Sequence, residues 1–96
     1  MGLIEVFEFR MNDNSVAEIH ANVRIFKSAI ERISDIQKVE FLIAKDNPSI
    51  LWQIIEWKTD SASPQGMKEY FSLPEMGMFS NFMIAPPRRI ENFLRI

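Results

Sequence analysis

A single apolar stripe runs along one helical face of residues 16–33 and constrains the fold more than any other feature of the sequence. Its members recur at steps of three and four, the spacing of one side of an α-helix. They are Val16, Ile19, Val23, Phe26, Ile30 and Ile33. Ser15 and Glu18 have the spacing of a capping box, in which each side chain binds a free backbone N–H at the helix start. The pattern predicts a helix of about five turns that buries only one side.

Four segments with period-two alternation of apolar side chains predict β-strands around this helix. They are residues 3–11, 36–45, 50–58 and 88–96. The sequence DNPS separates the second strand from the third and predicts a turn, because Asn tolerates turn conformations and Pro48 cannot donate to a ladder. A connection this short joins antiparallel neighbours, so these two strands are expected to form a hairpin.

Residues 64–83 predict a second helix in two pieces. Pro64 suits a first helical turn, where its missing N–H is no loss, and Pro74 ends or kinks the helix after Ser72. Ser72 and Glu75 have capping-box spacing, which predicts a new helix start. The element order β-α-β-β-α-β is typical of an α+β, ferredoxin-like domain, with a four-stranded antiparallel sheet and two helices on one face.

The predicted strands carry large apolar side chains on both faces of the sheet, and this indicates how copies of the chain associate. Helices cover one face of such a sheet, and the other face is then expected to be polar. Instead, the first strand carries Phe7 and Phe9 on one face and Ile4 and Val6 on the other. The third strand likewise carries Trp52 and Ile54 on one face and Ile55 and Trp57 on the other. An exposed apolar face is an association surface, so we expect a homodimer that packs sheet against sheet. The alternative is a monomer whose outer face is diluted by the charges of Glu5, Glu8, Arg10, Glu40 and Glu56.

Composition excludes several classes of site and partner. The 96 residues predict one domain, residues 1–96, and an apolar share of 47% fits a globular chain. No apolar run approaches the ~20 residues of a membrane span, and the acidic start differs from a signal peptide, so a cytoplasmic protein is expected. The absence of Cys and the single His argue against a metal site. A net charge of −2 with interspersed signs argues against nucleic-acid binding.

The end of the third predicted strand and the broken helix carry a resemblance to a known family. The strand ends in Glu56-Trp57, a polar turn follows, and then comes MKEYFSLPEMGMFSNFM. This arrangement resembles the antibiotic biosynthesis monooxygenase family, most specifically over residues 54–83. The resemblance implies a dimeric α+β barrel. Some members of this family are cofactor-independent monooxygenases that act on polycyclic quinols, some degrade haem, and many have no known activity.

Haem degradation is not expected from this chain. In that branch of the family, an Asn on the first strand and a Trp and a His on a helix line the haem. Residues 3–11 contain no Asn, and residues 64–83 contain neither His nor Trp. The catalytic His that some quinol oxygenases carry on the second helix is missing for the same reason. We therefore expect no cofactor.

Four residues are candidates for catalysis, and a fifth, Asn81, is a candidate for orienting a substrate; each has a simpler structural explanation. His20 could act as a general base at a pocket edge, although a half-exposed boundary position is favoured. Asn22 could bind a substrate carbonyl, although a capping or solvent-facing amide is favoured. The indole of Trp57 could stack on an aromatic ring and donate its N–H, although core packing is favoured. Tyr70, like Asn81, lies on the broken helix and could orient a phenolic substrate, with surface placement as the alternative.

Met and Phe residues concentrate on the broken helix and predict the wall of an apolar pocket between sheet and helices. Thioether side chains fill irregular gaps and also suit adaptable binding surfaces, so core packing remains an alternative. The break at Pro74 would allow this helix to act as a lid. The residues expected to bind a ligand are Phe26, Trp57, Phe71, Met76, Phe79 and Met83.

Two kinds of function follow from these patterns. In the first, the pocket binds a small aromatic or quinol substrate and orients it for reaction with dioxygen, while the chain supplies deprotonation, orientation and desolvation. No strong base is evident, and an acid such as Glu56 would need a raised pKa to serve. In the second, the chain holds a small hydrophobic ligand without catalysis, or serves only as a dimerisation module.

Overall fold

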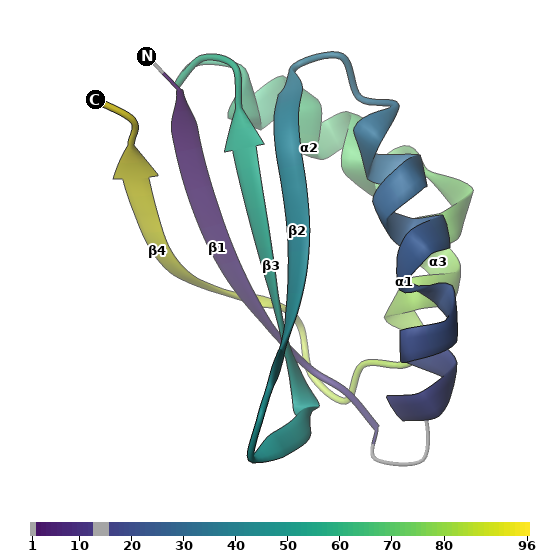
Figure 1. The fold of residues 1–96 in the computed structure, drawn as a ribbon. Coiled ribbons are helices and arrows are strands. Elements are labelled where there is room, and N and C mark those ends of the chain that lie inside the picture. Colours follow the sequence, from purple (N-terminus) through teal and green to yellow (C-terminus); the bar gives the residue numbers. More distant parts are fainter. Residues whose placement is uncertain (1, 13–15) are drawn as a thin grey trace.

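The computed structural model of this chain describes residues 2–12 and 16–96. Within these residues, four strands and three helices follow one another in the order β-α-β-β-α-α-β (Figure 1). The strands are β1 (Leu3–Arg10), β2 (Ile36–Ala44), β3 (Asn47–Trp57) and β4 (Arg88–Leu94). The helices are α1 (Val16–Glu31), α2 (Ser63–Ser72) and α3 (Pro74–Ser80).

The strands of the described chain form a four-stranded antiparallel sheet in the order β2-β3-β1-β4. β1 pairs with β3 on one side and β4 on the other, and β2 and β3 form the expected hairpin. The helices cover one face of this sheet (Figure 1). This is the ferredoxin-like α+β arrangement that the element order predicted, with the second helix in two pieces.

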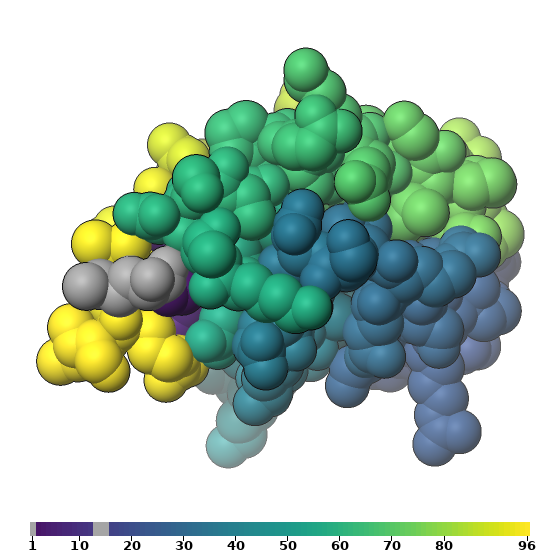
Figure 2. All heavy atoms as spheres, turned by 90° about the horizontal axis from the view of Figure 1, so that it is seen from above, coloured from purple at the N-terminus to yellow at the C-terminus, as the bar shows by residue number. Residues whose placement is uncertain are grey.

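The helices form one layer. Seen from the end of the sheet that carries both termini, α1 lies beside α2 and α3, and the C-terminal residues lie on the other side of the molecule (Figure 2). Of the helices in residues 2–12 and 16–96, none is long and apolar enough to cross a membrane.

The hairpin turn is tighter than expected. The sequence predicted a turn at residues 46–49, whereas the chain turns at residues 45–46 and β3 already begins at Asn47. Pro48 has no backbone N–H to donate to the sheet. It is tolerated there because the register between β2 and β3 shifts at this end of the hairpin, where the ladder is irregular.

The helix breaks at Pro74 as expected, but the capping box predicted beside the break does not form. The capping box predicted at residues 72–75 is wrong, because the hydroxyl of Ser72 donates to the carbonyl oxygen of Lys68 in α2, at 2.8 Å. Leu73 instead adopts an extended conformation, with ψ of 130°, before Pro74. A residue that precedes proline is pushed out of the helical region, which suffices to end α2. The other predicted capping box includes Ser15, which lies outside the described residues.

The apolar stripe of α1 packs onto the sheet as its spacing predicts. Phe79 of α3 joins this core, and its ring lies edge-on to Phe9 and Phe26, with centroid separations of 5.2 and 4.6 Å. Such edge-to-face pairs add to the stabilisation that burial alone provides. The buried cluster also contains Met11, Ile19, Ile30, Ile33, Ile36, Val39, Leu51, Ile55, Trp57, Tyr70 and Met76.

The face of the sheet away from the helices, called the open face here, is part apolar and part charged. Leu42, Trp52 and Phe93 are exposed on it. Four ion pairs lie among them: Glu8–Arg10, Glu8–Arg88, Lys38–Glu40 and Glu56–Arg95. Glu5, which was expected on this face, is instead buried on the helix side, because it shares the parity of Phe7 and Phe9.

Candidate functional site

An apolar cavity of about 90 Å³ lies between the sheet and the helices α2 and α3. Phe7 and Phe9 of β1 and Gln53 of β3 form its sheet side. The remaining lining residues come from the broken helix and the segment that follows it: Met67, Tyr70, Phe71, Met76, Phe79, Ser80, Met83 and Pro87. The Met and Phe residues of the broken helix are therefore both core and cavity wall.

Two buried polar side chains meet on this apolar wall. The amide Nε2 of Gln53 donates to the hydroxyl oxygen of Tyr70 at 3.1 Å. Because the phenol accepts this hydrogen bond, its own proton is available to an oxygen atom of a ligand. Burial raises the pKa of Tyr70 to about 12, and the hydrogen bond from Gln53 offsets only part of this shift. Tyr70 is therefore a neutral hydrogen-bond donor at physiological pH.

The last turn of α2 forms the outer part of the cavity. Phe71 is 67% exposed although it lines the cavity, so it stands at the mouth. Its ring lies edge-on to that of Tyr70, with centroids 5.3 Å apart. The helix ends directly after these residues, at Leu73, and α3 starts at Pro74. The mouth of the cavity thus lies beside the break between the two helices.

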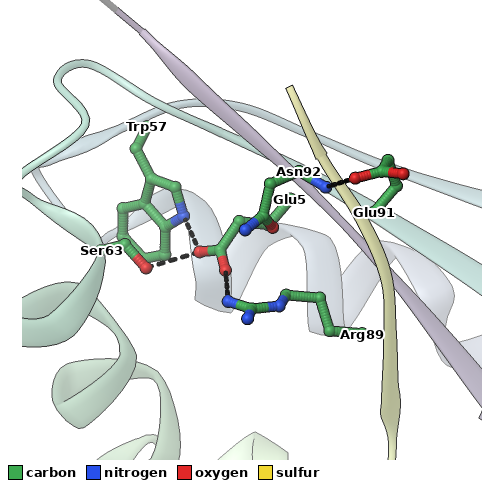
Figure 3. A network of polar contacts seen from close by, with 6 residues as sticks. All are labelled: Glu5, Trp57, Ser63, Arg89, Glu91 and Asn92. Carbon is green, nitrogen blue, oxygen red and sulfur yellow. Dashed lines mark hydrogen bonds and ion pairs between the residues drawn. The ribbon is translucent and has the colours of Figure 1, made fainter. Parts of the chain in front are cut away.

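A buried carboxylate lies near the cavity, two residues before Phe7 on the same face of β1. Glu5 is 3% exposed. Its Oε1 accepts hydrogen bonds from Nε1 of Trp57 at 2.7 Å and from Oγ of Ser63 at 2.5 Å (Figure 3). Its Oε2 lies 3.4 Å from Nη1 of Arg89. These donors satisfy the carboxylate and hold the indole ring in one orientation.

Gly66 allows α2 to approach this indole ring. A Cβ atom at Gly66 would lie 2.0 Å from Cζ3 and 2.5 Å from Cη2 of Trp57, far inside van der Waals contact. The absence of a side chain at this helical position is therefore what lets α2 pack directly on Trp57. The same packing fixes the height of α2, and with it Tyr70, above the sheet.

The residues predicted to bind a ligand divide into two groups. Phe71, Met76, Phe79 and Met83 line the cavity, as does the catalytic candidate Tyr70. Phe26 is fully buried in the core, and Trp57 is fully buried against Glu5 and Gly66; neither lines the cavity. Their assignment as ligand-binding residues rests on the sequence alone.

The other catalytic candidates lie away from the cavity. His20 is exposed on α1. Nδ2 of Asn22 donates to the carbonyl oxygen of Glu18, one turn back in the same helix, at 2.7 Å. Asn81 ends α3 and is exposed. These positions match the simpler structural explanation that the sequence offered for each residue.

Glu56, considered from the sequence as a base, lies on the open face. Its carboxylate forms two contacts with Arg95, of 2.6 and 2.9 Å. The hydrogen bond from Arg95 lowers the pKa of Glu56, and this outweighs the opposing effect of burial. A base would need the opposite shift, so Glu56 is unsuited to proton abstraction near neutral pH.

Known proteins resemble this chain in structure only. No family sequence profile and no curated protein matches it in sequence. A protein described as an antibiotic biosynthesis monooxygenase superposes with a TM-score of 0.77 at 9% identity, covering 100% of this chain and 99% of that chain. A mutant of SnoaB, a cofactor-independent oxygenase from Streptomyces nogalater, gives a TM-score of 0.76 at 14% identity, covering 98% and 92%. A conserved protein from Methanosarcina mazei gives 0.76 at 13% identity, covering 97% and 91%.

These superpositions cover nearly the whole chain, and the identities are too low to carry more than the fold. The chain therefore has the fold of antibiotic biosynthesis monooxygenases. The resemblance that residues 54–83 indicated is confirmed at this level.

Proposed function

We propose that the cavity between the sheet and the helices α2 and α3 binds a small aromatic hydroxy compound, such as a phenol or quinol, and that the chain promotes its oxidation by dioxygen without a cofactor. The observation that carries the proposal is Tyr70, a buried neutral phenol held by Gln53 on the wall of an apolar cavity. The shared fold with a cofactor-independent oxygenase supports it.

The reaction needs only the substrate and dioxygen. A ring hydroxyl loses its proton, the ring carbon para to the resulting oxyanion forms a bond to dioxygen, and the hydroperoxide then loses water. A hydroxyarene with a free para C–H plus dioxygen gives a quinone plus water. The substrate supplies all four electrons that dioxygen accepts, so no further reductant enters.

Tyr70 has the central role in this scheme. Its hydroxyl donates to the substrate oxygen and stabilises the oxyanion, which lowers the substrate's pKa. Among the described residues that line the cavity there is no carboxylate or imidazole, so the released proton passes to water at the mouth, near Phe71 and Ser80. The apolar walls exclude water from the peroxide.

The size of the cavity sets a condition on this function. At about 90 Å³ it is smaller than the ~150 Å³ engineered cavity that holds benzene. An aromatic ring therefore enters only when the wall moves. The break at Pro74 and the exposed ring of Phe71 make the junction of α2 and α3 the part of the wall that opens.

Oxygen uptake tests the proposal directly. With 1-naphthol and 1,5-dihydroxynaphthalene as substrates, both of which have a free para C–H, the wild-type chain is expected to consume one dioxygen for each quinone formed. Tyr70→Phe is expected to lower kcat about a hundredfold, the usual cost of losing one donor to an oxyanion. His20→Ala, an exposed control on α1, should leave kcat unchanged. Uptake no faster than in buffer, or full activity of the Tyr70→Phe variant, would contradict the proposal.

A second function, binding of a small hydrophobic ligand without chemistry, is favoured by one observation. The described residues around the cavity supply a hydrogen-bond donor but no base. A naphthol that raises the unfolding midpoint while oxygen uptake stays at the buffer rate would assign this function.

We also propose that two copies of the chain associate through the open face. Leu42 and Trp52 are cross-strand neighbours on this face and are exposed together with Phe93. Packing of two open faces about a two-fold axis would remove these side chains from water.

Light scattering is expected to give twice the chain mass of 11.2 kDa. Trp52→Lys should shift the species to the monomer, because it places a charge in the centre of the contact. Ile25→Lys, at an exposed apolar position on α1, is the matched control and should remain dimeric. A wild-type mass of one chain would contradict the dimer and would show that the open face, with its ion pairs, remains exposed to solvent.

A further inference from the structure

We propose that the ligand of the cavity carries a carboxylate, and that this group pairs with Arg89 at the cavity rim. The inference rests on the proposed function, since it assumes that an aromatic ring occupies the cavity. It narrows the ligand to a hydroxylated aryl carboxylate.

The pairing of β4 with β1 places Arg89 beside the cavity. Arg89 lies opposite Phe7 in the β1–β4 register, and Phe7 lines the cavity. Residues opposite one another in an antiparallel pair have Cα atoms about 4.5–5.5 Å apart. Pro87, two residues before Arg89, also lines the cavity. The guanidinium group extends on the helix side of the sheet, where it faces Glu5 (Figure 3).

The charge of Arg89 is incompletely satisfied. Its contact with Glu5 measures 3.4 Å, whereas charge-assisted hydrogen bonds are about 2.7–2.9 Å. By comparison, Arg32 holds Glu75 through two contacts of 2.6 Å each. The side chain of Arg89 is 57% exposed. Among the residues described, it pairs only with Glu5, so most of its five N–H donors remain available to a second anion.

Glu5 does not depend on Arg89. Its Oε1 already accepts two shorter hydrogen bonds, from Trp57 at 2.7 Å and from Ser63 at 2.5 Å. A ligand carboxylate can therefore draw the guanidinium toward the rim without leaving Glu5 unpaired. Arg89 is thus suited to bind an anion that arrives from outside.

The cavity itself cannot take the charged group. Apart from Gln53, Tyr70 and Ser80, its lining residues are apolar, and an unpaired carboxylate within it would lose its hydration without compensation. The ring must therefore enter while the carboxylate stays at the rim. In a hydroxylated aryl carboxylate, the ring hydroxyl can meet Tyr70 while the carboxylate pairs with Arg89.

The test compares 3-hydroxyphenylacetate with its neutral amide, 3-hydroxyphenylacetamide, by NMR titration under nitrogen. The wild-type chain is expected to bind the acid about tenfold more tightly than the amide, a difference typical of one charge-assisted contact. Arg89→Gln should remove this preference and leave amide binding unchanged. Arg89→Lys should keep most of it, because it keeps the charge.

Arg88→Gln is the matched control. Arg88 is the neighbouring residue on β4, and its guanidinium likewise makes a single contact, of 3.3 Å, with a carboxylate, that of Glu8 on the open face. The Arg88→Gln variant should retain the preference for the acid. Loss of the preference in both Gln variants would overturn the proposal, because the net charge of the chain, rather than contact with Arg89, would then be the cause.

The outcomes separate this inference from the proposed function. Equal affinity of the wild-type chain for acid and amide would overturn the role of Arg89, while the proposed function would stand because the ring still binds. Binding of neither compound would overturn both. Because Arg89 is more than half exposed, its replacement should leave the NMR spectrum of the core unchanged.

Discussion

Replacement of Gly66 by Ala is expected to lower the free energy of unfolding by about 3 kcal/mol, at the upper end of the usual cost of overpacking. The new Cβ would lie 2.0 Å from Cζ3 of Trp57. The indole cannot retreat, because it is fully buried and its Nε1 is bound to Glu5 at 2.7 Å. The helix α2 must therefore lift from the sheet, and this displaces Tyr70 from Gln53.

The measurement is urea unfolding of this variant beside Gly77→Ala. Both glycines lie in helices, where Ala is the better helix former, but a Cβ at Gly77 would have no neighbour within 4 Å. Gly77→Ala is therefore expected to raise the free energy of unfolding by about 0.4–1 kcal/mol. The two variants should change stability in opposite directions. A stabilising effect of both would contradict the close packing of α2 on Trp57.

Replacement of Glu5 by Ala is expected to cost about 3 kcal/mol of unfolding free energy, from a void in the core and two donors left without an acceptor. Those donors are Nε1 of Trp57 and Oγ of Ser63. The fluorescence of Trp57 should also change, because the indole loses the group that orients it. Thermal or urea unfolding followed by tryptophan emission measures both effects.

Glu5→Gln is the matched control for this prediction. An amide oxygen still accepts both hydrogen bonds, so only the long contact with Arg89 is lost, and a cost of about 1 kcal/mol or less is expected. Equal losses in the Ala and Gln variants would show that the charge of Glu5, rather than its role as acceptor, stabilises this region.

The architecture was predictable because apolar residues recur in the sequence with the period of the helix or strand whose one side is buried. The stripe of α1 and the alternation in the strands reflect which side of each element meets the core. The break at Pro74 was also predictable, because a proline ends or kinks a helix, whereas the capping box beside it was predicted wrongly. The capping box at Ser72 and Glu75 does not form because both side chains have other partners. The hydroxyl of Ser72 donates to the carbonyl oxygen of Lys68, and the carboxylate of Glu75 pairs with Arg32.

The cavity was only partly predictable. The Met and Phe residues of α2 and α3 indicated an apolar wall, but periodicity cannot distinguish a residue that lines a cavity from one that packs beside it. Trp57 illustrates this limit. Its parity places it on the helix side of the sheet, but its burial depends on Gly66, nine residues later, which lets α2 pack directly on the indole ring. Only the approach of α2 decides that Trp57 is core.

The polar residues of the site left a signal that could have been used. Glu5 has the parity of Phe7, and Gln53 has the parity of Leu51; each is a polar residue at an inward-facing strand position. Such a residue must find a partner when it is buried. Their partners, Tyr70 for Gln53 and Trp57 for Glu5, lie far away in the sequence and could not be identified without the fold.

The most direct test of ligand binding in the cavity is thermal unfolding of the wild-type chain with a panel of naphthols, quinols, fatty acids and haem. A ligand at ~100 times its dissociation constant adds ~2.7 kcal/mol to the free energy of unfolding, which raises the midpoint by several degrees in a chain of this size. Such a shift is expected with hydroxylated aromatics, and a smaller one is expected for the Tyr70→Phe variant. No shift with any of these compounds would contradict ligand binding in the cavity, and would mean that the Met and Phe residues of α2 and α3 form a closed core.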